Sequence, residues 1–189
     1  MTSPAPASGA THPWKALLKT GAVLAGYAAA FAVASAAVYV RQLHTQGLAA
    51  PAPDDMSALG EDFFFVQVFG GMGLFPTGLA LYFLRRVRAF WTLLGIAALA
   101  FAASGSFAAT VIQLTSSLPS LPSFWIAWAS LGVLRVLPSP LFAAAFLLGS
   151  CFAPSRFARW ALLGATVIEG AVAAFGLFHW FIAPRLGAL

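Results

Sequence analysis

Two charged residues stand inside long apolar stretches of the sequence, where a charge is costly. Arg135 lies in the apolar run 124–152, and Glu169 lies in the run 161–182. At 1.5 Å per helical residue, each lies about 12 to 15 Å from the nearer end of its run, close to the middle of a bilayer core ~30 Å thick. An unpaired charge there costs several kcal/mol. We therefore expect these oppositely charged side chains to form an intramembrane charge pair.

Three interpretations of the pair remain open. A structural salt bridge that sets the packing of two helices needs no substrate, and we favour it. A proton or ion relay, or a counter-charge for a polar substrate, is the functional alternative, because intramembrane ionisable groups often line such pathways. In the third, Glu169 is protonated, since desolvation favours the uncharged acid. Pro138 also predicts a free carbonyl that could accept a hydrogen bond from Arg135.

Neutral polar residues form a second group in the apolar runs. Gln67, Thr110 and Gln113 fall in the outer halves of their runs, where they could line a polar vestibule. Hydrogen bonding between helices is the simpler explanation, because amide side chains in membranes commonly do this. Small residues also recur every four positions in the run 89–114, which suits close helix packing: Ala98, Ala102, Ser106 and Thr110.

The sequence lacks the motifs of common catalytic and metal sites. It has no Gly-x-Ser-x-Gly elbow, no His-Glu-x-x-His and no Gly-rich phosphate loop ending in lysine. Cys151 is the single cysteine, so there is no internal disulfide and no cysteine pair for a metal. We expect no catalytic residue, no metal site and no cofactor, and a protein that is not an enzyme.

The composition is that of an integral membrane protein. Hydrophobic residues make up 61% of the 189 residues and charged residues only 8%, against about a quarter charged in soluble domains. The net charge of +5 is compatible with nucleic-acid binding, but phosphate binding needs a solvated basic face. Here the basic residues lie in short segments between apolar runs. The expected surroundings are a lipid bilayer, and we expect no nucleic-acid partner.

Five apolar runs are long enough to cross a bilayer as helices. They cover residues 17–40, 63–84, 89–114, 124–152 and 161–182. Pro138 and Pro140 interrupt the fourth run, which we interpret as one kinked helix because a span restarted there would be too short. A cleaved signal peptide is the alternative for the first run, but that run is longer than a typical signal sequence.

The predicted fold is all-α, with one transmembrane domain over residues 15–189 and an acidic external loop over residues 41–62. Residues 1–14 are expected to form a disordered cytoplasmic tail. Helices two to five are expected to form a four-helix bundle, with the Ala-rich first helix packed on its side.

Basic residues in two short loops predict the orientation in the plasma (inner) membrane. They are Arg85, Arg86, Arg88, Arg156 and Arg159. Arginines concentrate on the cytoplasmic side of membrane proteins, so the N-terminus should be cytoplasmic and the C-terminus external. Trp91 and Trp160 follow these loops and should lie at the inner headgroup level, where indoles settle.

A short sequence motif occurs twice. Residues 91–95 (Trp-Thr-Leu-Leu-Gly) and 160–164 (Trp-Ala-Leu-Leu-Gly) each follow a basic loop and open an outward-running helix. A tandem hairpin repeat would explain this, with helices two and three duplicated as four and five. Chance recurrence in a biased composition explains it equally well.

Our first functional hypothesis is a small non-enzymatic membrane protein that works by association, as an accessory or structural subunit or as a homo-oligomer. The alternative is a small transporter or proton-coupled permease that uses Arg135 and Glu169. A water-filled cavity reaching Glu169 would favour transport, and a dry contact would favour structure. A third and weaker class, an enzyme acting on lipid, lacks a visible nucleophile.

Overall fold

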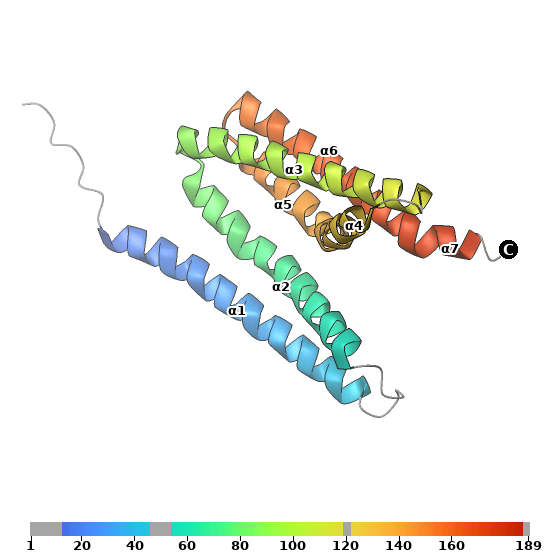
Figure 1. Cartoon of the computed structure of the whole chain (residues 1–189). Coiled ribbons are helices and arrows are strands. Elements are labelled where there is room, and N and C mark those ends of the chain that lie inside the picture. Colours follow the sequence, from blue (N-terminus) through green and yellow to red (C-terminus); the bar gives the residue numbers. More distant parts are fainter. Residues whose placement is uncertain (1–12, 46–53, 119–121, 187–189) are drawn as a thin grey trace, which may run out of the picture.

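The structure, a computed structural model, describes residues 13–45, 54–118 and 122–186, and every element in these ranges is helical (Figure 1). The elements are α1 (Pro13–Thr45), α2 (Asp54–Leu84), α3 (Arg88–Ser117), α4 (Ser123–Val136), α5 (Ser139–Phe152), α6 (Arg156–Leu177), the π-helix η1 (Phe178–Ile182) and α7 (Ala183–Leu186). Four of these helical stretches are long and apolar enough to span a membrane, or five if the bent α4–α5 pair is one span. The described part of the chain is therefore all-helical, with several helices that have the length and hydropathy of membrane spans.

Helices α1 and α2 are longer than the apolar runs that predicted them. The predicted acidic loop over residues 41–62 is largely helical, because α1 continues to Thr45 and α2 already begins at Asp54. Acidic residues suit the first turns of a helix, where they face the positive end of its dipole. Gln42 donates a hydrogen bond to the Glu61 carboxylate at 2.7 Å and joins the two helices at this end. Residues 46–53 lie outside the described ranges, as do residues 1–12 of the predicted disordered tail.

The predicted single helix over residues 124–152 is broken in two. Helices α4 and α5 meet at an angle of 47°. Pro138 and Pro140 explain the break, because neither ring nitrogen can donate the backbone hydrogen bond that a continuous helix needs. The prediction from sequence located the interruption correctly. The bend between the two helices is larger than the predicted kink in one continuous helix implies.

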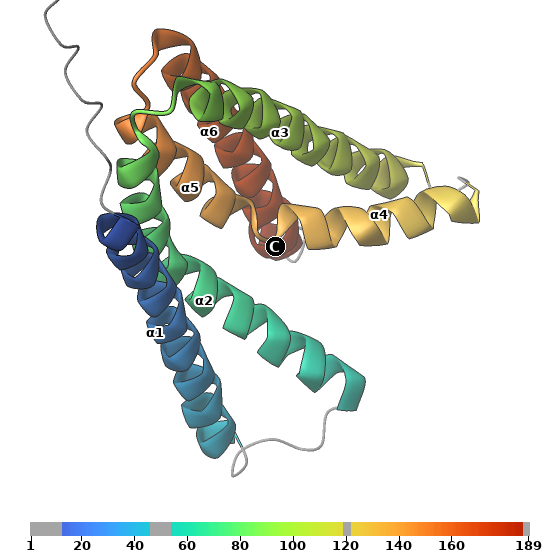
Figure 2. The same cartoon turned by 90° about the vertical axis from the view of Figure 1, so that its left-hand side faces the viewer.

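Helices α3 to α6 pack against one another more extensively than α1 and α2 pack against them. Helices α3 and α6 run side by side in the same direction, α5 packs on α6, and α4 packs on α3. Helix α2 joins this group mainly through α5, and α1 packs mainly against α2. Figure 2 shows α1 and the first turns of α2 lying apart from α3 to α6.

Close packing of small residues joins α1 to α2. A Cβ atom on Gly26 would lie 2.8 Å from Cβ of Pro76, so the absence of a side chain at Gly26 permits this approach. One residue later, the hydroxyls of Tyr27 and Thr77 are 2.7 Å apart and hydrogen-bonded. Ala34 is fully buried. These contacts set the pairing of the α1–α2 hairpin.

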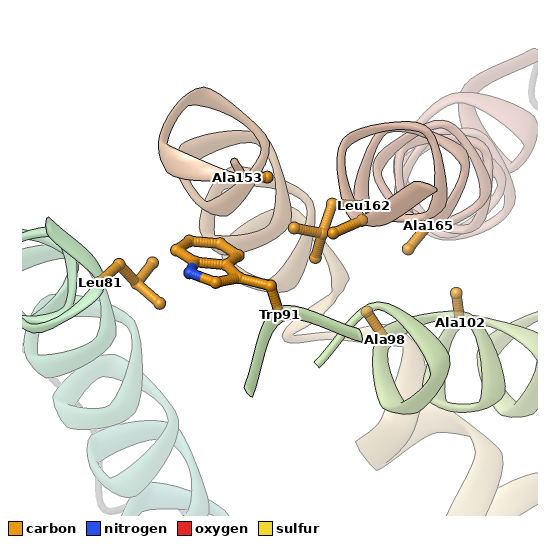
Figure 3. Close-up of a cluster of buried hydrophobic side chains, with 8 residues drawn as sticks. Leu81, Trp91, Ala98, Ala102, Ala153, Leu162 and Ala165 are labelled. Carbon is orange, nitrogen blue, oxygen red and sulfur yellow. The ribbon is translucent and has the colours of Figure 1, made fainter. Parts of the chain in front are cut away.

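The main core lies where the ends of α2 and α5 meet the beginnings of α3 and α6 (Figure 3). Its buried members are Leu81, Trp91, Ala98, Ala102, Ala153, Ala158, Leu162 and Ala165. Trp91 has no exposed surface, and its indole nitrogen donates to the Leu84 carbonyl at 3.0 Å. The side chain of Trp91 therefore packs between helices, and its depth in a bilayer stays a prediction.

The two copies of the repeated motif occupy different surroundings. Trp91 is buried, whereas Trp160 is 73% exposed. The next matched pair reverses this order, since Leu93 is 68% exposed and Leu162 is fully buried. Equivalent positions of a structural repeat should face equivalent neighbours, so the packing lends the repeat no support.

Candidate functional site

Arg135 and Glu169 come together at the centre of the α3–α6 group. Arg135 lies in the last turn of α4, and Glu169 lies on the buried face of α6. Nη2 of Arg135 donates to Oε1 of Glu169, and Nη1 donates to Oε2 at 3.3 Å. The contact is a two-pronged guanidinium–carboxylate pair, the geometry that gives such a pair both strength and a defined orientation.

The guanidinium also bonds to two other helices. Its Nη2 donates to the carbonyl of Phe101 on α3 at 2.9 Å, and its Nε donates to Oγ of Ser104 at 3.2 Å. Nη1 donates to Oγ of Ser139, the first residue of α5, at 3.4 Å. The carbonyl acceptor thus comes from α3 and not from the helix broken at Pro138, because the side chain reaches across to α3 and α6. One side chain connects four helices.

Two rings and a glycine shape the space around the guanidinium. Its Cζ lies 4.0 Å from the ring centroid of Phe101 and 5.3 Å from that of Phe142, distances at which a cation is attracted to an aromatic ring. On α3, a Cβ atom at Gly105 would lie 3.0 Å from Nη2 and 3.2 Å from Cζ. The helix backbone can approach the charge because Gly105 has no side chain.

The carboxylate is closed to solvent. The side chain of Glu169 is 0% exposed and that of Arg135 is 17% exposed. The exposed edge of Arg135 lines a groove of about 250 Å³ between α3 and α4, beside Phe107 and Trp128. Throughout the described part of the chain, every buried side-chain nitrogen and oxygen has a hydrogen-bond partner. The geometry suits holding helices together better than exchanging protons with water.

The residues of the predicted vestibule are not brought together. Gln113 and Thr110 line a groove of about 580 Å³ between α3 and α6, which Glu169 does not line. Gln67 lies elsewhere, where its Nε2 donates to the carbonyl of Leu137 at 3.5 Å. Its amide therefore bonds to the backbone at the break between α4 and α5. The Thr110 hydroxyl donates to the Ser106 carbonyl of its own helix at 2.8 Å.

No protein-family model matches the chain, and no curated protein or solved structure gives a significant match. The function must therefore be argued from the geometry of this chain.

The charge pair was predicted from the sequence, but the residues that surround it were not. The missed residues are Phe101, Ser104, Gly105, Ser139 and Phe142. The buried row on α3 runs through Ala98, Ala102, Gly105 and Ala108. The predicted four-residue row turns away from the neighbouring helices after Ala102, because a helix has 3.6 residues per turn. Counting at 3.6 residues would have pointed to Gly105 as a contact position.

We expect Gly105→Ala to destabilise the protein by about 1 to 3 kcal/mol, the usual cost of overpacking. The added methyl group meets a guanidinium that is held by acceptors on α3, α5 and α6 and cannot easily yield. Thermal unfolding in detergent micelles would measure the loss. Gly170→Ala is the matched control, because no heavy atom lies within 4 Å of the position that its methyl group would take. Equal stability of the Gly105 variant and the wild type would contradict the tight packing.

Proposed function

We propose that this chain is a small non-enzymatic membrane component that works by association, either with another membrane protein or with further copies of itself. The observation that carries the proposal is the closed ion pair between Arg135 and Glu169. A relay or a substrate site needs a path from water to the ionisable group. Glu169 has no exposed surface and is already bonded through both carboxylate oxygens.

We further propose five membrane crossings, with α4 and α5 as one broken span. In this arrangement α2, α3, α4–α5 and α6 form the bundle, and α1 lies outside it. The arginine-rich turns 85–88 and 153–159 are placed on the cytoplasmic side of the plasma (inner) membrane, with the N-terminus cytoplasmic and the C-terminus external. The positive-inside bias supports this orientation.

Helix α1 is the surface that we propose for association. It packs mainly on α2, and much of its remaining surface is apolar. Leu24 is 63% exposed and Val33 is 44% exposed. A helix joined to its own protein along one side leaves its other sides to lipid or to a partner helix, and a partner can add packing contacts that fluid lipid does not.

Native mass spectrometry of the gently solubilised protein tests the association. We expect a second polypeptide, or further copies of this chain, at constant stoichiometry. A photocrosslinking residue at position 24 should capture that partner. The same residue in place of Val167, which is 72% exposed on α6, is the matched control and should react mainly with lipid. A bare monomer with no protein adduct at position 24 would contradict the proposal.

Transport is the second candidate function. The break between α4 and α5 lies beside the ion pair, and broken helices often carry the binding sites of transporters. Solute or proton uptake into proteoliposomes would test it. Uptake by the wild type that is lost in Glu169→Gln would favour transport over association.

A further inference from the structure

Five arginines gather at one end of the molecule. The α2–α3 turn and the α5–α6 turn lie together at this end in Figures 1 and 2. Their basic residues are Arg85, Arg86, Arg88, Arg156 and Arg159. The core described above connects the turns, because Trp91 bonds to the Leu84 carbonyl and clusters with Ala153 and Ala158. Lys19 of α1 lies 5.2 Å from the ring centroid of Phe83, near the same end.

Among the described residues, none of these arginines has a carboxylate partner. All five are exposed. Arg85 lies over the Tyr82 ring at 4.6 Å, and Arg159 donates to the Ala153 carbonyl at 3.2 Å. Neither contact offsets the charge. The result is a cluster of like charges without a counter-anion in the described chain, and like charges at close range repel one another.

Aromatic side chains border the arginine cluster. Tyr82 is 45% exposed, Phe157 is 53% exposed and Trp160 is 73% exposed, and each lies within a few residues of an arginine. Exposed aromatic residues at the end of a membrane helix typically lie at the level of the lipid headgroups. The cations are thus held where the phosphate groups of a bilayer lie, so a lipid fits this surface better than a soluble anion.

We propose that this arginine-rich end binds the phosphate headgroup of an anionic phospholipid, such as phosphatidylglycerol, in preference to a zwitterionic one. Charge complementarity carries the proposal, because a zwitterionic headgroup has no net negative charge and brings its own cation to the cluster. Helices α3 and α6 both begin at this end, and their dipoles add positive potential of the same sign. The proposal needs only that the chain is embedded in lipid, and it does not rest on the association proposed above.

Lipid retention in native mass spectrometry tests the proposal directly. The full chain is purified in micelles that hold equal amounts of phosphatidylglycerol and phosphatidylcholine, and the two kinds of lipid adduct are counted. We expect the wild type to retain phosphatidylglycerol preferentially. The result does not depend on how the chain inserts in cells, because the purified protein meets both lipids at both ends.

The test variant is Arg86→Gln/Arg88→Gln/Arg156→Gln. Within the described residues, these three guanidinium groups have no ion pair, hydrogen bond or ring contact, so their removal takes away charge and leaves packing in place. At about fivefold per cation near anionic lipid, the preference should fall on the order of a hundredfold. The corresponding triple lysine variant should keep most of it. Arg185→Gln, which removes an exposed cation near the C-terminus, should also keep it.

Three outcomes would overturn the proposal. They are equal retention of the two lipids by the wild type, full preference in the triple glutamine variant, and an equally large loss of preference in Arg185→Gln. If the glutamine variant cannot be purified folded, raised salt with the wild type replaces it. An ionic contact should then lose its preference as ionic strength rises, and a preference independent of salt would contradict the proposal.

Discussion

Replacing Glu169 with glutamine is expected to lower the free energy of unfolding by about 3 to 5 kcal/mol. The substitution keeps the shape of the side chain and removes its charge. The guanidinium of Arg135 would remain among helices with no counter-charge, and only 17% of that side chain is exposed. A buried charge that has lost its partner is among the most destabilising changes known for single substitutions.

Unfolding by heat and by denaturing detergent would measure this loss. Asp62→Asn is the matched control, because Asp62 is an exposed acid near the start of α2 and its neutralisation should change stability little. If Glu169 carried a proton in the native protein, glutamine would be a near-isostere and stability would be unchanged. That result would contradict a structural salt bridge between Arg135 and Glu169.

The double variant Arg135→Leu/Glu169→Leu tests whether the fold needs the two charges or only well-packed side chains at these positions. Apolar replacement of both members of a buried ion pair is often neutral or stabilising, because the desolvation of two charges no longer opposes folding. We expect the double variant to be more stable than Glu169→Gln. If it also shows the same association state as the wild type in native mass spectrometry, the proposed association does not depend on the two charges.

The existence and rough extent of the helices could be predicted from the sequence, because runs of apolar residues of this length have few other stable states in lipid. The break between α4 and α5 could be placed from Pro138, but its angle could not. That angle depends on how α4 packs on α3 and how α5 packs on α6. Those contacts arise from the assembled bundle and not from the local sequence.

The charge pair could be predicted because only Arg135 and Glu169 are ionisable at that depth, and few alternative partners exist. Its further acceptors could not be predicted. The Phe101 carbonyl is a backbone group, which no sequence pattern marks as an acceptor. Gly105 appears in the sequence as one of many small residues, and its role depends on which face of α3 turns toward α4.

Trp91→Ala should lower the free energy of unfolding by about 3 to 5 kcal/mol, the range for truncating a fully buried large aromatic residue. The indole has no exposed surface and fills the space between α2, α3, α5 and α6 (Figure 3). In lipid the loss comes mainly from packing contacts that fluid chains cannot replace. Trp91→Phe keeps most of the volume and loses the hydrogen bond to the Leu84 carbonyl, so it should cost only about 1 kcal/mol.

Trp160→Ala is the matched control for the Trp91 variants. Both tryptophans open the same five-residue motif, but Trp160 is 73% exposed and its truncation should cost about 0.5 kcal/mol or less. Thermal unfolding of the three variants in one detergent would compare them. Equal losses for the two alanine variants would contradict the packing described here and would favour equivalent roles in a hairpin repeat. A large loss of stability at Trp91 alone would mean that two nearly identical stretches of sequence have different structural roles. The first tryptophan would pack inside the bundle, and the second would face lipid.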